Sequence, residues 1–233
     1  MRVRAIFRCV LVGLVCCLLA ATAEARPRLV VVLIIDQFRA DYLEKFRGDF
    51  VPGGFARLLR HGAVFANTHY DYSGTETAPG HASISTGAVP AAHGIIGNLW
   101  YDRALKKSVT SVEDAAYKFV GVDKSPGASP HSLLGTALAD EVRMAFRGES
   151  VAVSLKDRSA ILPGGKHPTA VFWFDDPGSE KAVTSTYYMD RLPAWVEDFN
   201  QKYALSQYVG KEWRALNAHP DEPALAVIAK PGT

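Results

Sequence analysis

Cysteine is scarce in this sequence. Only three of its 233 residues are cysteine, and Cys9, Cys16 and Cys17 all lie close to the N-terminus. If that segment is removed, the remaining chain contains none. Disulfides, thiolate metal ligands and a nucleophile derived from cysteine are then excluded.

The sequence also has no excess of positive or negative charge once residues 1–25 are removed. Removing residues 1–25 takes away three of the 26 basic residues and one of the 24 acidic residues, which leaves equal numbers of both signs. A chain so close to neutral offers no basic surface for nucleic acid and no polybasic patch for a membrane. We therefore expect no nucleic-acid partner.

Long apolar runs are confined to the N-terminal segment. Arginines at positions 2, 4 and 8 precede the apolar run Val10–Ala20, and small residues follow up to Ala25. This pattern is typical of a signal peptide, and the run is short for a membrane span. A retained N-terminal anchor is the alternative. The pattern predicts a signal peptide over residues 1–25, a mature chain that is periplasmic or secreted, and no stable membrane span after cleavage.

The remaining chain is apolar enough for one buried core, and it shows no tandem repeat or low-complexity tract. Continuous aliphatic runs typical of buried parallel strands occur at 29–35, 151–155 and 170–174. Patterns typical of helices occur at 39–46, 55–60, 132–146 and in the second half of 187–203. The pattern predicts an α/β fold, with a mostly parallel central sheet and helices on both faces. We also expect a strand over 63–72 and an excursion of hairpins at the sheet edge over about 102–128.

The stretch Gly74–Ser83 contains a candidate nucleophile. Pro79 suits the first turn of a helix, where a missing N–H costs nothing. That geometry places the Thr77 hydroxyl at a helix N-terminus, among N–H groups that favour an anion. The alternative is that Thr75 or Thr77 is only a helix cap.

Two further positions carry groups suited to a phosphate site. Asp36 follows the apolar run 29–35, and the carboxyl ends of parallel strands are where α/β proteins place ligand-binding groups. Lys156 and Arg158 follow the run 151–155 and would point the same way if the backbone stays extended. The alternative for Asp36 is that it caps the helix expected near Arg39. The alternative for Lys156–Arg158 is an ordinary solvated turn.

These positions follow the order and context of a known family. The chain resembles the alkaline phosphatase superfamily, specifically its type I phosphodiesterase/nucleotide pyrophosphatase branch, and within it bacterial alkaline phosphatases with a threonine nucleophile. The matching segments are Val32–Gln37, Thr77–Ser83, His93–Asn98 with Trp100–Tyr101, Ser154–Ala160 and Thr184–Tyr188.

The resemblance implies a role for each position. Asp36 and the oxygen of Thr77 would bind one of two zinc ions, and Thr77 would form a phospho-threonine intermediate. Asn98, Lys156 and Arg158 would bind the non-bridging oxygens of the phosphate. Two cations suit the dianion of a phosphate monoester, so the implied activity is zinc-dependent hydrolysis of phosphate monoesters.

The sequence departs from the family pattern after Arg158. The family's remaining metal ligands are an Asp with a His four residues on, an Asp-His pair and a late His, and no such set follows. We therefore expect residues 26–233 to be the N-terminal portion of an alkaline-phosphatase-like catalytic domain that is truncated. Its metal site would be incomplete, because the remaining zinc ligands are absent from this chain, and it would have little activity alone.

The sequence also allows other functions, and it contains other polar residues near the candidate site. The alternatives are a phosphodiesterase, nucleotide pyrophosphatase or sulfatase-like hydrolase of the same superfamily, and a non-catalytic exported phosphate-binding module. His81 and His93 match no ligand position of the family, so we expect both to hydrogen-bond loop backbone. Glu76 and Asp175 are expected in a solvated loop or at a helix cap.

Overall fold

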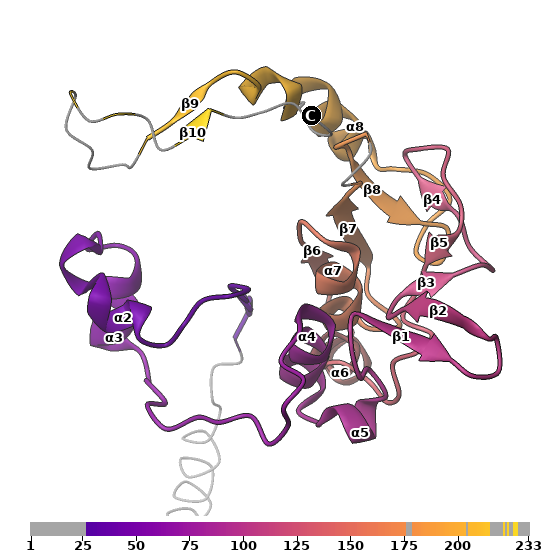
Figure 1. The fold of residues 1–233 in the computed structure, drawn as a ribbon, viewed down its shortest axis with the longest axis horizontal. Coiled ribbons are helices and arrows are strands. Elements are labelled where there is room, and N and C mark those ends of the chain that lie inside the picture. The colour runs from indigo at the N-terminus through magenta and orange to yellow at the C-terminus, as the bar shows by residue number, and fades with distance from the viewer. Residues whose placement is uncertain are drawn as a thin grey trace, which may run out of the picture. The chain divides into compact units, whose positions relative to one another are not determined.

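The computed structural model describes residues 27–175, 179–203, 205–214, 221, 223 and 226–227 (Figure 1). The predicted signal peptide, residues 1–25, lies outside the described residues. Across these described ranges, no helix combines the length and the apolar character that a membrane span requires. The chain divides into two units, Met1–Ala40 and Asp41–Thr233.

In the first unit, the predicted central strand over Leu29–Ile35 is wrong. The segment is extended but pairs with no described strand, and Leu29, Val31 and Leu33 are each at least 76% exposed. An apolar run identifies residues that gain from burial, but a central strand also needs neighbours on both edges and both faces. The described part of this unit supplies no such neighbour.

The second unit begins with short helices. They are α2 (Tyr42–Lys45), the 3₁₀ helix η1 (Arg47–Asp49) and α3 (Phe55–His61). Gly62 ends α3, and a Cβ there would lie only 2.6 Å from the carbonyl oxygen of Leu58, so a larger residue would not fit.

The strand predicted over 63–72 is also wrong, because this stretch is an irregular loop. Side chains bend it locally. The Thr68 hydroxyl donates to the carbonyl of Phe65 at 3.2 Å, and the His69 ring lies 2.7 Å from the Asn67 side-chain oxygen. Such local hydrogen bonds compete with strand pairing.

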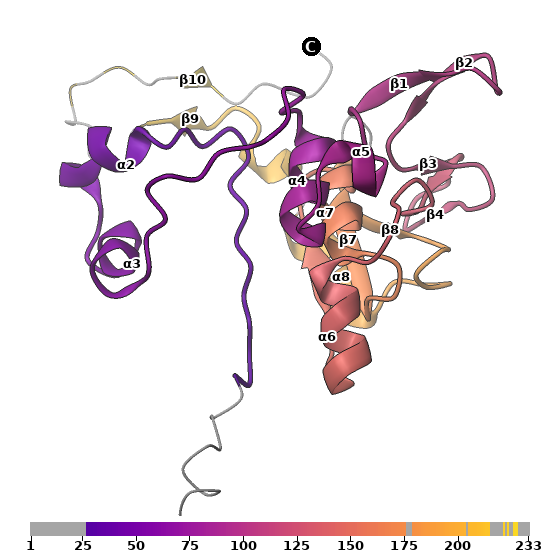
Figure 2. The ribbon, with the colours of Figure 1, turned by 90° about the horizontal axis from the view of Figure 1, so that it is seen from below.

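The next part of the chain alternates helices and small strands. It contains α4 (Thr77–Thr86), α5 (Pro90–His93), β1 (Leu99–Asp102), β2 (Lys107–Thr110), β3 (Glu113–Asp114), β4 (Phe119–Val120) and β5 (Gly127–Ala128). β1 and β2 form an antiparallel hairpin that projects from the unit (Figures 1 and 2). β3 pairs with β5 in a second antiparallel pair, and β4 joins the main sheet.

The main sheet has the order β4-β8-β7-β6. Its other strands are β6 (Val151–Val153), β7 (Ala170–Phe174) and β8 (Ala182–Ser185). β6 pairs parallel to β7, whereas β7–β8 and β8–β4 are antiparallel. The described sheet is therefore mixed.

Side chains of β7 alternate between two hydrophobic cores. Val171 and Trp173 join a core that includes residues of α4 and α7 (Asp157–Gly164). Phe172 points the other way and packs with Val196 of α8 (Ala194–Lys202). Because successive residues of a strand point to opposite faces, α4 and α7 cover one face of the sheet and α8 the other. The predicted α/β class with helices on both faces is confirmed.

The remaining elements complete the second unit. They are α6 (Leu138–Phe146), the 3₁₀ helix η2 (Leu205–Tyr208), β9 (Glu212–Trp213) and β10 (Ala226–Val227). The helix predicted over 132–146 starts only at Leu138, because Gly135 has a φ of 79° that no right-handed helix accommodates. β9 and β10 form an antiparallel pair.

Candidate phosphate site

Thr77 is the first residue of α4. The preceding residue, Glu76, is extended with φ −76° and ψ 169°, and Pro79 lies in the first turn as expected. Ala78 and Pro79 are buried against the core, whereas Thr77 is half-buried. The hydroxyl of Thr77 is therefore carried at the edge of the core, at the positive end of a ten-residue helix.

Asn98 lies beside this helix N-terminus. Its side-chain oxygen Oδ1 accepts a hydrogen bond from the backbone N–H of Ala78 at 2.8 Å. Its own N–H donates to Glu76 Oε2 at 2.7 Å, and its carbonyl accepts from the N–H of Ser111 at 3.1 Å. Because Oδ1 is engaged by an N–H group, the amide nitrogen Nδ2 faces away from Ala78 and its N–H groups can donate to another acceptor.

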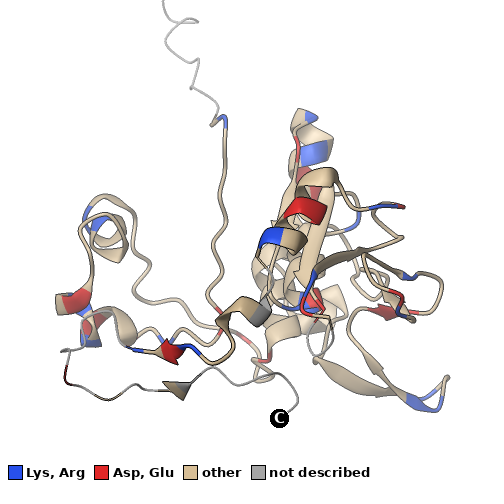
Figure 3. Cartoon of the chain, turned by 90° about the horizontal axis from the view of Figure 1, so that it is seen from above, with Lys and Arg blue, Asp and Glu red and all other residues tan. Residues whose placement is uncertain are grey.

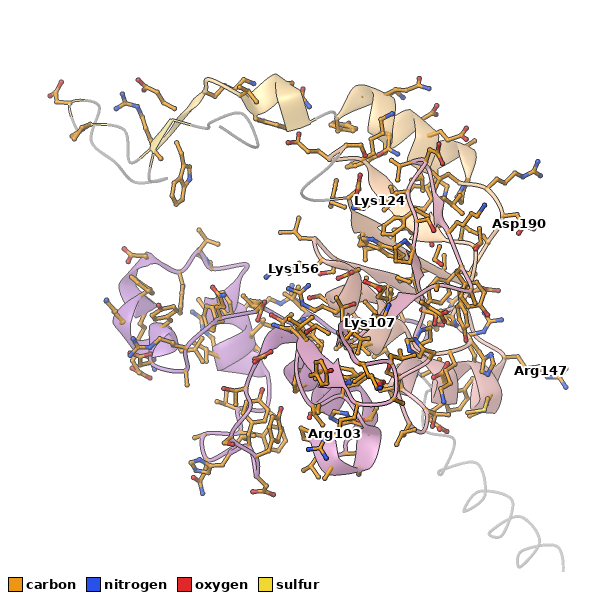
Figure 4. All side chains as sticks on the ribbon, turned by 45° about the vertical axis from the view of Figure 1, so that its right-hand side comes forward. Arg103, Lys107, Lys124, Arg147, Lys156 and Asp190 are labelled. Atoms are coloured by element: carbon orange, nitrogen blue, oxygen red, sulfur yellow. The ribbon has the colours of Figure 1, made fainter. Side chains whose placement is uncertain are left out.

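Lys156 and Arg158 lie at the start of α7. Lys156 is the N-cap residue and Asp157 the first helical residue, so the backbone does not stay extended from 155 to 158. An acidic residue in the first turn favours a helix start there. The Lys156 side chain reaches out from this end of the helix (Figure 4).

The Arg158 guanidinium is incompletely satisfied. Its Nη1 lies 3.4 Å from Asp157 Oδ1, but its Nε is buried without a hydrogen-bond partner in the described part of the chain. Buried polar groups are usually paired, because an unmade hydrogen bond is costly. An anion bound at this helix start would supply the missing acceptor.

α4 and α7 pack side by side (Figures 1 and 2). The Ser85 hydroxyl donates to the carbonyl of Leu162 at 3.3 Å, which joins the second halves of the two helices. Small residues, Ala78 and Ala82 on α4 and Ala160 on α7, share one core and permit a close approach. An antiparallel pair joined at this point would overlap only at its ends. We therefore infer from the extensive contact between α4 and α7 that they run in the same direction, with their N-termini at the same end of the pair.

The structure thus brings four predicted residues to one end of a helix pair: Thr77 and Asn98 at α4, and Lys156 and Arg158 at α7. Two helix N-termini and two cations favour an anion there. The negative charges of Glu76 and Asp157 partly offset this preference for an anion. Elsewhere in the unit, basic and acidic residues are interspersed (Figure 3).

Both histidines near the site bind backbone groups, as predicted, although the partner of His81 belongs to α4 and not to a loop. His81 Nδ1 lies 2.8 Å from the carbonyl oxygen of Thr77. His93 is buried, its Nδ1 accepts from the N–H of Ile95, and its Nε2 lies 3.0 Å from the Ser83 hydroxyl. Burial lowers the pKa of His93, an effect that a backbone hydrogen bond partly offsets.

Asp175 is not a solvated loop residue or a helix cap, as the sequence predicted. It is 5% exposed, and its carboxylate binds Lys124 Nζ at 2.6 Å and the N–H of Ser179 at 2.9 Å. Burial alone would raise the pKa of Asp175, but the bonds from Lys124 and Ser179 and the Lys124 charge together lower it. Asp175 therefore ties the end of β7 to its neighbours and is outside the candidate site.

The described residues do not by themselves fit a zinc ion. No group of three or more His, Cys, Asp or Glu side chains in the described ranges is arranged to hold a metal. Asp36 belongs to the first unit, where it follows the extended segment and forms a turn with Gln37. Catalytic zinc sites normally have three protein ligands, and Asp36 with Thr77 would supply two.

These features agree with comparisons to known proteins. The chain belongs to the type I phosphodiesterase / nucleotide pyrophosphatase family, whose model matches residues 30–231. It is 48% identical over 198 residues to alkaline phosphatase PafA of Elizabethkingia meningoseptica, covering 83% of this chain and 36% of that protein. It is 47% identical over 195 residues to alkaline phosphatase PhoV of Synechococcus elongatus, covering 82% of this chain and 35% of that protein.

Solved structures of alkaline phosphatase PafA are also similar to this chain. The crystal structure of wild-type alkaline phosphatase PafA matches with a TM-score of 0.80 and 46% identity, covering 84% of this chain and 38% of that chain. A PafA variant matches with a TM-score of 0.79, 45% identity and coverage of 84% and 39%. In that variant a threonine is replaced by serine, and an asparagine, a lysine and an arginine by alanine.

The resemblance stated from the sequence is therefore confirmed. The match is to the N-terminal part of these relatives, and the chain spans little more than a third of the length of those curated proteins.

Proposed function

We propose that this chain carries the nucleophile and the phosphate-binding groups of a phosphate monoester hydrolase. The observation that carries the proposal is the parallel packing of α4 and α7. This packing supports the proposal, because Thr77 and Asn98 belong to the N-terminal end of α4 and Lys156 and Arg158 to that of α7.

In the proposed reaction, a bond forms between the Thr77 hydroxyl oxygen and phosphorus while the bond from phosphorus to the ester oxygen breaks. The Thr77 proton leaves and the alcohol departs with a proton from solvent. Water then attacks phosphorus, the phospho-threonine bond breaks, and inorganic phosphate and the Thr77 hydroxyl are restored. Asn98, Lys156 and Arg158 stabilise the charge on the non-bridging oxygens in both steps.

The relatives support these assignments. PafA and PhoV are both named alkaline phosphatases. The four residues replaced in the PafA variant are of the same types, and in the same order, as Thr77, Asn98, Lys156 and Arg158. Its threonine and asparagine have the same separation as Thr77 and Asn98, and its lysine and arginine are likewise two positions apart.

Charge favours a monoester over a diester. A monoester presents a dianion with three non-bridging oxygens, which one lysine and one arginine can neutralise, whereas a diester carries one charge fewer. Replacing both Lys156 and Arg158 by alanine should therefore lower the monoester rate far more than the diester rate. A double variant that retains the full monoester rate would contradict this.

The zinc dependence implied by the family is a proposal that the described residues do not support alone. We propose that Asp36 and Thr77 contribute to a zinc site and that its other ligands are not in this chain. The 233-residue protein should then hold well under one zinc ion per chain. Near-stoichiometric zinc with steady turnover would refute the incomplete site.

The direct test is p-nitrophenyl phosphate hydrolysis by the zinc-supplemented protein and its Thr77→Ala variant. The proposal predicts slow hydrolysis that Thr77→Ala abolishes while phosphate still binds. Equal rates for the two proteins would contradict the nucleophile assignment. Rates with bis-p-nitrophenyl phosphate and p-nitrophenyl sulfate separate a diesterase or a sulfatase-like enzyme from a monoesterase.

The buried Nε of Arg158, which has no hydrogen-bond partner among the described residues, also favours a second candidate, a phosphate-binding module without chemistry. Phosphate binding without turnover, zinc dependence or phospho-threonine would support it. Export to the periplasm or the medium remains a prediction for both candidates. Secretion of a fusion carrying residues 1–25 tests it.

A further inference from the structure

The contacts around Asn98 point to a positioning residue that the sequence did not identify. Glu76 is the N-cap residue of α4, yet its side chain makes no hydrogen bond within its own helix. Its carboxylate instead crosses to the loop before β1 and accepts the backbone N–H of Asn98 at 2.7 Å.

The two segments run alongside each other around this contact. A Cβ on Gly74 would lie 3.7 Å from the carbonyl oxygen of Ile96. At Gly97 a Cβ would lie 3.6 Å from Glu76 Oε2 and 3.1 Å from the carbonyl oxygen of Leu99. The loop is therefore close against Glu76, and glycine at position 97 keeps that space open.

Asn98 is consequently hydrogen-bonded to the residues on either side of Thr77 in the chain. Glu76, immediately before Thr77, accepts from the Asn98 backbone, and Ala78, immediately after Thr77, donates to the Asn98 side chain. The second bond fixes the amide so that Oδ1 faces α4. Nδ2 has no hydrogen-bond partner within the described ranges.

The charge of Glu76 and its hydrogen bond to Asn98 should have opposite effects on phosphate binding. A carboxylate near a phosphate site repels the dianion, and it would weaken binding if its charge were its only contribution. Its hydrogen bond to Asn98 has the opposite effect, because it holds the loop that carries a phosphate donor. Misplacing a catalytic donor by about 1 Å can cost up to about 100-fold in rate.

We propose that Glu76 is a positioning residue, which holds Asn98 so that Nδ2 donates to a phosphoryl oxygen at Thr77. The inference rests on the proposed phosphate site and extends it to a residue outside the predicted set. Glu76 acts through Asn98 and does not itself touch the substrate.

The test uses the full-length chain and the Kd for inorganic phosphate, measured by isothermal titration calorimetry. Glu76→Ala removes both the charge and the acceptor, whereas Glu76→Gln removes the charge but keeps an oxygen that can accept from Asn98. We expect Glu76→Ala to raise Kd about tenfold. Glu76→Gln should leave Kd unchanged or lower it, because only the repulsion is lost.

Asn98→Ala supplies the second arm of a double-mutant cycle. If Glu76 acts through Asn98, adding Glu76→Ala to Asn98→Ala should change Kd by less than about twofold. Hydrogen exchange at the Asn98 backbone N–H, followed by NMR, should accelerate in Glu76→Ala and remain slow in Glu76→Gln. Glu113→Ala, which removes a carboxylate 3.9 Å from Lys107 Nζ, is the matched control and should change neither quantity.

The outcomes separate this inference from the proposed function. Equal or tighter phosphate binding by Glu76→Ala, with wild-type exchange at Asn98, would overturn the inference and leave the phosphate site standing. A tenfold loss that persists undiminished in the Asn98→Ala background would also overturn it. A wild-type chain that binds no phosphate would overturn both.

Discussion

His93 is a buried imidazole that holds the loop after α5 against α4. Its Nδ1 accepts the Ile95 N–H, so the neutral ring carries its proton on Nε2 and donates it to the Ser83 hydroxyl. Protonating Nδ1 would break the first bond and bury a charge. Neutral His93 is therefore part of what keeps the loop that carries Asn98 in place.

We predict that acid destabilises the protein through His93. Its pKa is lowered in the folded state, so between that value and about 6.5 the unfolded chain binds more protons than the folded one. The stabilisation is fully present above about pH 6.5 and is lost as pH falls toward the folded pKa.

Urea unfolding midpoints at pH 7.5 and 5.5 measure the effect. The midpoint should fall more in wild type than in His93→Gln, which does not titrate. His61→Gln, at the exposed end of α3, is the control. An equal drop in wild type and His93→Gln would contradict the prediction.

The positions of several candidate site residues in the fold could be predicted from local pattern. Pro79 indicates a helix start and so locates Thr77, while Lys156 and Arg158 follow an apolar run. The role of Glu76 was not predictable in this way, because its partner lies 22 positions away along the chain. Only the tertiary structure brings such groups together.

At the scale of the elements, the start of α6 is fixed to the loop after α7. Asp140 of α6 is fully buried, and its carboxylate accepts backbone N–H groups of Ala137, Lys166 and His167. Gly165 passes directly over it with a φ of 76°. A Cβ at Gly165 would lie 2.7 Å from Asp140 Cγ.

We predict that Gly165→Ala is strongly destabilising. The methyl group would overlap a carboxylate that its hydrogen bonds prevent from moving, in addition to the strain of a positive φ. We expect a loss of about 3 kcal/mol or more in the free energy of unfolding.

Gly135→Ala is the matched control for this prediction. Gly135 has a similar φ of 79°, but a Cβ there would meet nothing within 4 Å. It should cost only about 1 kcal/mol, from backbone strain alone. Equal losses for the two variants in urea unfolding would show that the Asp140 contact is unimportant.

Strand prediction succeeded where the apolar run has neighbours. Ala170–Phe174 is a strand over the predicted residues, because its side chains fill a core on each face. Leu29–Ile35 has the same type of pattern but no strand partner among the described residues of its unit. The condition of extended backbone over Leu155–Arg158 is not met, because Asp157 starts a helix directly after Lys156.

At the scale of the whole molecule, apolar surface is exposed at one edge of the main sheet. β6 is the last strand of that sheet, and Val151, Val153 and Leu155 are 59%, 65% and 70% exposed. An apolar edge strand can pair with another chain. The 233-residue protein is therefore expected to self-associate.

We predict that Val153→Lys reduces this association. A lysine on an edge strand opposes pairing between copies, and the exposed side chain at this position leaves room for it. Sedimentation velocity at increasing concentration should show less oligomer for Val153→Lys than for wild type. Ile84→Lys on α4, where Ile84 is 46% exposed, is the control and should associate like wild type. Unchanged association in Val153→Lys would exclude the β6 edge.

The account as a whole depends on covalent chemistry at Thr77. The most direct measurement is an acid-quenched reaction of the zinc-supplemented protein with p-nitrophenyl phosphate, followed by mass spectrometry of the peptide that contains Thr77. The account predicts one added phosphate on Thr77, absent from the Thr77→Ala variant. Substrate hydrolysis without phosphate on Thr77, or with phosphate on another residue, would contradict it.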